Sequence, residues 1–138
     1  MGYDFYRRDN LREPRSYSGD GCFRAANDTF ALIYGVMSAF GILDEVMQGP
    51  EPKGASEETR ALRSADPALV PAYKFLSNDG WIVTPEECDI VASALERGLR
   101  ETRAHLEPSP EEEGGLDFLD RFARFNRAAQ KHGGYVVA

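Results

Sequence analysis

The stretch Ser77–Glu87, "SNDGWIVTPEE", contains residue types found in a calcium-binding loop, with an acid before a glycine and glutamates further on. Such a loop needs oxygen ligands at positions 1, 3, 5, 7, 9 and 12, and glycine at position 6. With Gly80 at position 6, Asp79 and Glu86 fall on positions 5 and 12, but Phe75 falls on position 1 without a side-chain oxygen. The stretch therefore predicts a turn that leads into a helix, and no metal site.

Thiol chemistry is the second kind that the residue types allow. A catalytic cysteine needs a base beside it that generates the thiolate. Cys88 lies on the apolar stripe of a predicted helix, and Cys22 lies in a predicted loop near Arg24. Neither cysteine is spaced with His105 or His132 as a nucleophile pair, and two histidines alone do not make a zinc site. We expect no catalytic residue, no metal and no cofactor.

Polar residues near the N-terminal strand and the start of the first long helix form the best candidate for a ligand site. The unpaired amides of a first helical turn can hold an anion. The candidate ligand-binding residues are Asp4, Tyr6, Arg24, Asn27, Asn78, Asp79 and Trp81. Structural roles are open for three of them: Asp4 can pair with an arginine, Asn27 can cap a helix, and Trp81 can lie in the core.

The strands that would position these residues follow from alternating apolar residues. Gly2–Arg7 reads as an N-terminal strand and Tyr135–Val137 as a C-terminal strand. Residues 72–76 and 81–83 read as a central hairpin, because Asp-Gly between two strand-like runs favours a tight turn. A helix over residues 67–77 is the alternative.

Three longer helices are predicted. The first is capped by Asn27 or Asp28, runs to about Leu43, and is apolar on every face, which is typical of a helix buried on all sides or against a second subunit. The second starts at the capping box Thr84–Glu87 and runs to about Leu106. The third covers Leu116–Lys131.

These elements predict one compact α+β domain over residues 1–138. Its three longer helices pack on a small, mostly antiparallel sheet made of the N-terminal strand, the central hairpin and the C-terminal strand. Flexible loops are expected near residues 10–21, 48–56 and 107–115, which are rich in Gly, Pro, Ser and charged residues.

Composition favours a cytoplasmic protein. The net charge of the 138 residues is −7 and the pI is about 4.8, so binding to nucleic acid is disfavoured. Two cysteines are too few for a disulfide scaffold. The N-terminus lacks the apolar region of a secretion signal, and the longest apolar run, Phe30–Leu43, is too short to span a membrane.

Four short motifs resemble an uncharacterised family of small actinobacterial and actinophage proteins. They are Met1-Gly2-Tyr3-Asp4, Phe23-Arg24, Asn78-Asp79-Gly80-Trp81-x-Val83-Thr84-Pro85-x-Glu87-Cys88 and Gly133-Gly134-Tyr135-x-Val137. The family often has Tyr-Phe-Arg before its first helix, where this chain has Cys22-Phe23-Arg24. The resemblance implies a source and a shared fold, and it supplies no chemistry.

Together these observations favour a small cytoplasmic binding or interaction protein, an accessory protein without catalytic machinery of its own. Its expected partners are a second copy, through the apolar helix Phe30–Leu43, another protein, or a small anionic ligand; neither nucleic acid nor a membrane is expected. The alternative is a small-molecule-binding or sequestering protein, or an enzyme, that uses the polar residues near the N-terminal strand.

Overall fold

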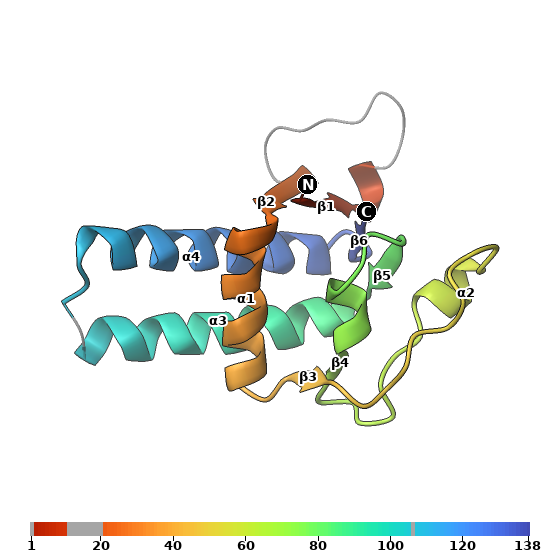
Figure 1. Ribbon diagram of the computed structural model, residues 1–138, viewed down its shortest axis with the longest axis horizontal. Helices are drawn as coiled ribbons and strands as arrows, with labels where there is room; N and C mark the ends of the chain where they lie inside the picture. Colours follow the sequence, from red (N-terminus) through yellow and green to blue (C-terminus); the bar gives the residue numbers. More distant parts are fainter. Residues whose placement is uncertain (1, 11–20, 106) are drawn as a thin grey trace.

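A computed structural model describes residues 2–10, 21–105 and 107–138 of the chain (Figure 1). In this part of the chain, an antiparallel sheet of four strands has the order β2-β1-β6-β5. The strands are β1 (Gly2–Arg7), β2 (Cys22–Ala26), β5 (Trp81–Val83) and β6 (Tyr135–Val137). The long helices are α1 (Asn27–Ala39), α3 (Pro85–His105) and α4 (Pro110–Gln130). The predicted α+β fold is confirmed.

The two ends of the chain meet inside the sheet, where β1 pairs with both β2 and β6. Alternation along β1 directs Phe5 inwards, where it is fully buried among aromatic rings that include Phe30 and Phe122. Asp4 and Tyr6 lie on the opposite face, because successive side chains of a strand alternate between its two faces. The predicted strands at Gly2–Arg7 and Tyr135–Val137 have the observed bounds.

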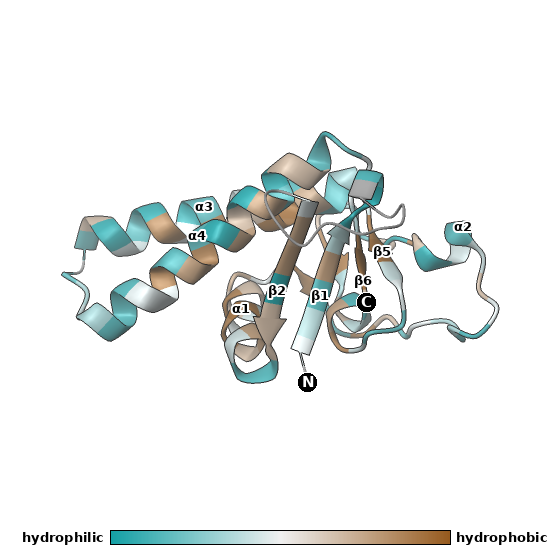
Figure 2. Ribbon diagram, turned by 90° about the horizontal axis from the view of Figure 1, so that it is seen from above, coloured by the Kyte–Doolittle hydropathy of each residue, from teal (hydrophilic) through white to brown (hydrophobic). Residues whose placement is uncertain are grey.

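Helices α3 and α4 form an antiparallel hairpin whose loop end extends beyond the sheet in both Figure 1 and Figure 2. The predicted capping box of α3 is confirmed: the Thr84 N–H donates to Glu87 Oε1 (2.9 Å), and the Glu87 N–H donates to Thr84 Oγ1 (3.3 Å). The predicted apolar stripe is buried, with Cys88, Val91 and Leu95 almost inaccessible to solvent.

Helix α4 begins at Pro110, so the loop expected near residues 107–115 is wrong from Pro110 onwards, and the helix predicted over Leu116–Lys131 starts six residues earlier. Ser109 and Glu112 close a capping box at its start. The signal was present in the sequence, because Ser109-Pro110-Glu111-Glu112 has the same pattern as Thr84–Glu87. The pair Gly114-Gly115 suggested a linker instead. Residues 48–56 carry no helix or strand, and residues 11–20 of the loop expected near 10–21 lie outside the described residues.

Helix α1 crosses in front of the α3–α4 hairpin in the view of Figure 1. Phe30, Ile33 and Met37 are its buried residues, so the prediction of a helix buried on every side within the fold is wrong, and burial against a second subunit stays a prediction. The helix ends at Ala39, before Leu43, because Gly41 adopts a positive φ of 68° that stops the helical path.

The predicted central hairpin is also wrong. Residues Ala72–Phe75 form a short 3-10 helix, η3, and β5 pairs with β6 instead. The chain before η3 forms β4 (Val70–Pro71), which pairs in parallel with β3 (Leu43–Asp44). Gly80 has the positive φ (83°) expected of a turn, but its N–H donates to the carbonyl of Val137 at 2.9 Å, which starts the β5–β6 pairing.

Strand β2 was not predicted. It is an edge strand in the described sheet, and it runs directly into α1, so Ala26 occupies the N-cap position in an extended conformation. Neither Asn27 nor Asp28 is the cap, and Ala26 makes no side-chain capping bond. A five-residue strand with two alanines has too little β-propensity to be recognised without its partner β1.

The short helix α2 (Glu57–Arg60) is capped by Ser56.

Candidate functional site

Asp4, Tyr6 and Arg24 come together on the outer face of the sheet. The antiparallel register places Asp4 opposite Arg24, and Arg24 Nε donates to Asp4 Oδ1 at 2.8 Å. The Tyr6 hydroxyl donates to Asp4 Oδ2 at 3.3 Å. The hydrogen bond to Asp4 raises the pKa of Arg24, whose side chain is 64% exposed. Three of the seven predicted residues therefore form one polar cluster that solvent reaches.

A hollow of about 340 Å³ lies beside this cluster and is open to solvent. We call it the strand-end hollow; it is lined by Gly2, Asp4, Arg24, Ala25 and Ala26. The backbones of β1 and β2 approach closely here, because a Cβ at Gly2 would lie 2.5 Å from the carbonyl oxygen of Ala25. The small side chains leave the space, and the Asp4–Arg24 pair supplies its charged wall.

Asn27 and Asn78 lie near the strand-end hollow without lining it. Asn27 is exposed in the first turn of α1. Asn78 reaches the start of β1, where its Nδ2 donates to the carbonyl oxygen of Gly2 at 3.0 Å. This bond fixes the loop before β5 against β1, and it is a structural role.

Asp79 and Trp81 do not join the polar cluster. The carbonyl of Asp79 accepts a hydrogen bond from Arg60, and Trp81 is almost fully buried. The indole Nε1 of Trp81 donates to Ser77 Oγ at 2.9 Å, and its ring stands edge-on to that of Tyr73. Both residues stabilise the approach to β5.

A buried ion pair lies behind β5, and sequence reasoning missed it. Lys74 and Glu87 are both 0% exposed. Lys74 Nζ donates to Glu87 Oε1 and to the carbonyl oxygen of Ile82, each at 2.7 Å. Burial lowers the pKa of Lys74, and the charge of Glu87 opposes that shift. Only the tertiary structure brings the lysine of η3 to the capping glutamate of α3.

The surroundings of this pair are also polar and buried. Asn126 and Tyr135 are fully buried, and within the described residues Glu87 Oε2, Asn126 Oδ1 and the Tyr135 hydroxyl have no hydrogen-bond partner. Burial raises the pKa of Tyr135 well above its ordinary value, and it also raises the pKa of the Cys88 thiol. A buried, protonated thiol is inert, which agrees with the sequence-based reading of Cys88 as a core residue.

Burial likewise raises the pKa of Cys22, and Arg24 opposes this shift only weakly. Both cysteines are unpaired and buried. Neither thiol is placed as a nucleophile.

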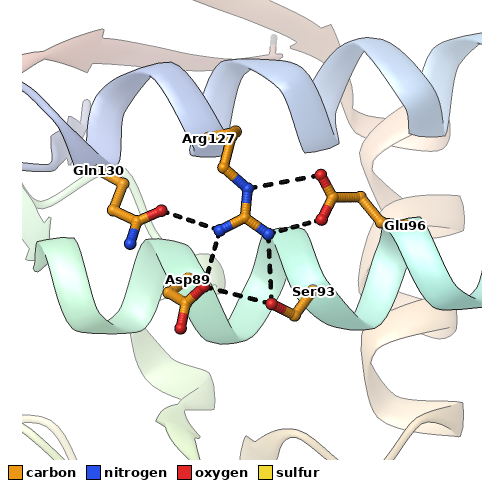
Figure 3. Close-up of polar contacts among 5 residues, drawn as sticks. All are labelled: Asp89, Ser93, Glu96, Arg127 and Gln130. Carbon is orange, nitrogen blue, oxygen red and sulfur yellow. Dashed lines mark hydrogen bonds and ion pairs between the residues drawn. The ribbon is translucent and has the colours of Figure 1, made fainter.

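Arg127 joins α3 and α4 in the polar cluster of Figure 3. Its guanidinium donates to Asp89 Oδ1 (2.7 Å), to Glu96 Oε1 (2.5 Å) and to Ser93 Oγ (3.2 Å) on α3. It also donates to Gln130 of its own helix. Glu96 and Asp89 raise the pKa of Arg127, so the guanidinium stays charged and its donors are occupied. This cluster fastens the hairpin.

Helix α1 leaves apolar residues on the surface. Its exposed residues after the first turn, which form its outward face, are Ala31, Leu32, Gly35, Ser38, Ala39 and the C-cap residue Phe40. Ser38 is the polar member, and its Oγ donates to Glu45 Oε1 at 2.9 Å. Leu32 is 43% exposed and Phe40 is 39% exposed. The ribbon of α1 is mostly brown in Figure 2, which marks hydrophobic residues. An exposed apolar helix face is a feature of interaction surfaces.

A groove of about 370 Å³ lies between α1 and the loop end of the hairpin. We call it the hairpin groove; its lining includes Leu32, Pro108, Glu111, Gly115, Leu116 and Leu119. Thr102 and Glu112 complete the described lining. Its wall is mostly apolar, and Glu111 and Glu112 are its acidic lining residues. Sequence reasoning did not predict this groove, because its residues come from separate elements.

Within residues 2–10, 21–105 and 107–138, no cluster of three or more His, Cys, Asp or Glu side chains could hold a metal ion. No helix in those ranges is both long and apolar enough to cross a membrane. The fold and the surfaces define an α+β protein with an exposed apolar helix face, an apolar groove and a small polar hollow. Comparisons with protein-family models, curated proteins and solved structures found no match.

Proposed function

We propose that this chain is a small cytoplasmic binding protein, an accessory protein that acts by contact with another polypeptide rather than by catalysis. The observation that carries the proposal is the outward face of α1. A solvated helix normally presents charged residues to water. Here no charged residue occurs between Thr29 and Leu43, although only Phe30, Ile33 and Met37 of the helix are buried.

A second copy of the chain is the partner we propose for this face. Ala31, Gly35 and Ala39 are spaced four residues apart and lie along one line of the helix. Small side chains let two helix backbones approach closely, and Leu32 supplies apolar area beside them. The helix carries no charged side chain on this face, and the Glu45 carboxylate that accepts from Ser38 lies at its C-terminal edge. Pairing across a two-fold axis centred near Gly35 therefore does not bring like charges together at the centre of the contact.

Light scattering coupled to gel filtration tests this proposal. We expect a mass of about twice the 15.3 kDa of one chain. Gly35→Arg should give the monomer mass, because it places a long cation at the centre of the face. A Cβ at Gly35 meets nothing within 4 Å, so the substitution should not disturb the fold.

Gly114→Arg is the matched control, since Gly114 is also an exposed helical glycine with open space around it. It should leave the mass of the assembly unchanged. A monomer mass for the unmodified chain at its highest soluble concentration would refute self-association through α1.

The strand-end hollow supports a second candidate function, binding or turnover of a small anionic molecule. Its charged wall carries Arg24, whose guanidinium is exposed and held in place by Asp4. An incoming anion must compete with the Asp4 carboxylate, so we expect weak binding. Titration calorimetry with inorganic phosphate, repeated with Arg24→Gln, tests it: heat that disappears in the variant supports the site, and no heat in either protein excludes phosphate as its ligand.

The proposal also includes a biological source, which is suggested by the motif Asn78-Asp79-Gly80-Trp81-x-Val83-Thr84-Pro85-x-Glu87-Cys88. We place the chain in actinobacteria or their phages, as an accessory to a neighbouring system. Gene neighbourhood tests this setting: recurrent genes of one system beside copies of this motif support it, and unrelated neighbours in every genome contradict it.

A further inference from the structure

We propose that the hairpin groove binds a cationic, apolar-tipped segment of another polypeptide. The inference rests on the proposed role of the chain as a binding protein, but it concerns the groove beside α1, which shares Leu32 with the outward face of that helix, and a partner other than a second copy. Three features of the groove carry it: an apolar wall, a glycine that keeps it open, and an acidic rim.

The apolar wall comes from three elements. Leu32 projects from α1, Pro108 belongs to the connection between the hairpin helices, and Leu116 and Leu119 belong to α4. Leu32 is 43% exposed, so its side chain still has apolar surface to cover. A groove of about 370 Å³ lies within the size range of ligand pockets, and it accepts apolar side chains of a partner.

Gly115 keeps the groove open. It lies inside α4, where glycine weakens a helix relative to alanine. A Cβ at this position would lie 3.5 Å from Leu32 Cδ2, in ordinary van der Waals contact. Alanine would therefore fit, whereas a larger side chain would project into the groove and against Leu32.

The rim of the groove is acidic. Glu111 and Glu112 line it, and none of the described lining residues is basic. Glu113 is neutralised by Arg103 at 3.1 Å, whereas Glu111 has no ion-pair partner within the described part of the chain. Glu112 accepts a hydrogen bond from the Ser109 N–H at 3.3 Å, and the partial positive charge at the start of α4, about half a unit, offsets only part of the charges of Glu111 and Glu112.

Charge complementarity therefore selects a cationic partner. A second copy that docked through its own groove would bring the same two glutamates against Glu111 and Glu112, and this local like-charge repulsion disfavours groove-to-groove self-association.

Fluorescence anisotropy with three labelled synthetic peptides tests the partner chemistry. Each has about 14 residues, roughly four helical turns. One carries leucines at helical spacing with lysines elsewhere, the second has glutamates in place of the lysines, and the third has serines in place of the leucines. We expect the leucine–lysine peptide to bind at least about tenfold more tightly than either control peptide. Equal binding of the leucine–glutamate peptide, or no binding of the leucine–lysine peptide, would overturn the inference.

Two glycine variants place the binding in the groove. Gly115→Leu should weaken binding of the leucine–lysine peptide by roughly tenfold or more, because it fills the groove without changing the charge. Gly114→Leu makes the same substitution at a neighbouring position that has open space, and it should bind as the unmodified chain does. Equal effects of the two substitutions would contradict the assignment. Circular dichroism checks that both variants fold.

Glu111→Gln is a second variant that tests the groove even if Gly115→Leu does not fold. It should weaken binding of the leucine–lysine peptide and make the dissociation constant less dependent on salt concentration, and unchanged binding would count against the acidic rim. The mass of the assembly, measured by light scattering for each variant, distinguishes binding in the groove from self-association through α1. Gly35→Arg should change this mass and leave peptide binding unchanged. A loss of assembly in Gly115→Leu would instead assign the groove to self-association.

Discussion

At the scale of single residues, the buried polar cluster around Lys74 is the least expected feature. An ammonium and a carboxylate without exposure are costly to desolvate, and their pairing only offsets that cost. Glu87 has two tasks, because the same Oε1 accepts from the Thr84 N–H and from Lys74 Nζ. The start of α3 and the position of η3 thus depend on one carboxylate.

Removing one partner of this pair should be more damaging than removing both charges. We expect Lys74→Met to lower the free energy of unfolding by about 3–5 kcal/mol, because Glu87 is left as a buried, unpaired charge. The double variant Lys74→Met/Glu87→Gln should be more stable than Lys74→Met alone, since glutamine keeps the capping bond and carries no charge. Urea denaturation followed by Trp81 fluorescence measures both. A double variant less stable than Lys74→Met would contradict the interpretation.

Tyr135 should make the chain sensitive to alkaline pH. Its pKa is raised by burial well above the model-peptide value of 10.0, so above pH 10 the unfolded chain loses this proton first. The unfolded state then binds fewer protons, and the free energy of unfolding falls as the pH rises. Tyr135→Phe should make this fall shallower, while its stability at pH 7 changes by no more than about 1 kcal/mol.

The check is a series of urea denaturations between neutral pH and pH 11, compared for the two proteins. The lowered pKa of Lys74 has the opposite effect, because it makes the free energy of unfolding rise as the pH rises. This contribution is the same in the unmodified chain and in Tyr135→Phe, so it does not affect the comparison. Identical slopes above pH 10 would show that the Tyr135 hydroxyl ionises as readily in the folded chain as in the unfolded one.

At the scale of elements, the α3–α4 hairpin is the main support of the apolar core. Its inner face supplies much of the apolar core, including Val91, Leu95 and Phe122, and its outer edge is fastened by Arg127. Pairs within one helix, such as Arg124 with Asp120, stabilise only that helix. Arg127 differs because both of its carboxylate partners belong to α3.

Arg127→Met should therefore lower the free energy of unfolding by about 1–2 kcal/mol, a modest value because the side chain is partly solvated. Arg124→Met is the matched control, and it should cost no more than about 0.5 kcal/mol. The difference should shrink at high salt, where exposed charges are screened. Equal losses in thermal unfolding would show that the inter-helix contacts of Arg127 contribute nothing.

At the scale of the whole molecule, the sheet joins the start and the end of the chain. β6 lies between β1 and β5 and pairs with both, so it connects β5 to the rest of the sheet. The entry to β6 is narrow. Gly134 has φ +85°, and a Cβ on it would lie 2.1 Å from the carbonyl oxygen of Val83. Only glycine fits beside β5 at this point.

Gly134→Ala should accordingly prevent β6 from pairing and lower the free energy of unfolding by about 3 kcal/mol or more. Gly133→Ala is the control: it has the same φ, but its Cβ would meet only Arg8 at 3.8 Å, so we expect a loss of about 1 kcal/mol. Chemical denaturation of the two variants measures the difference. A similar loss for both would mean that backbone conformation matters here and the contact with Val83 does not.

Features that depend on neighbouring residues were predictable from the sequence. The terminal strands follow from alternation, and the start of α3 follows from its capping box, because side chains and backbone meet within a few residues. The pairing of Asp4 with an arginine was also foreseen as an alternative, and three of the seven candidate site residues do come together. The turn predicted at Asp79-Gly80 is present, with a positive φ at Gly80, although it does not join the expected strands.

The sequence by itself determined the class of fold, the capped start of α3 and the polar face of β1, since these depend on period and local hydrogen bonds. Tertiary structure alone decided that β5 pairs with β6, that Lys74 meets Glu87, and that only one face of α1 is covered. An apolar residue looks the same in a sequence whether a neighbour covers it or not. The outward face of α1 and the hairpin groove, which carry the proposed functions, therefore became visible only when the elements were packed together.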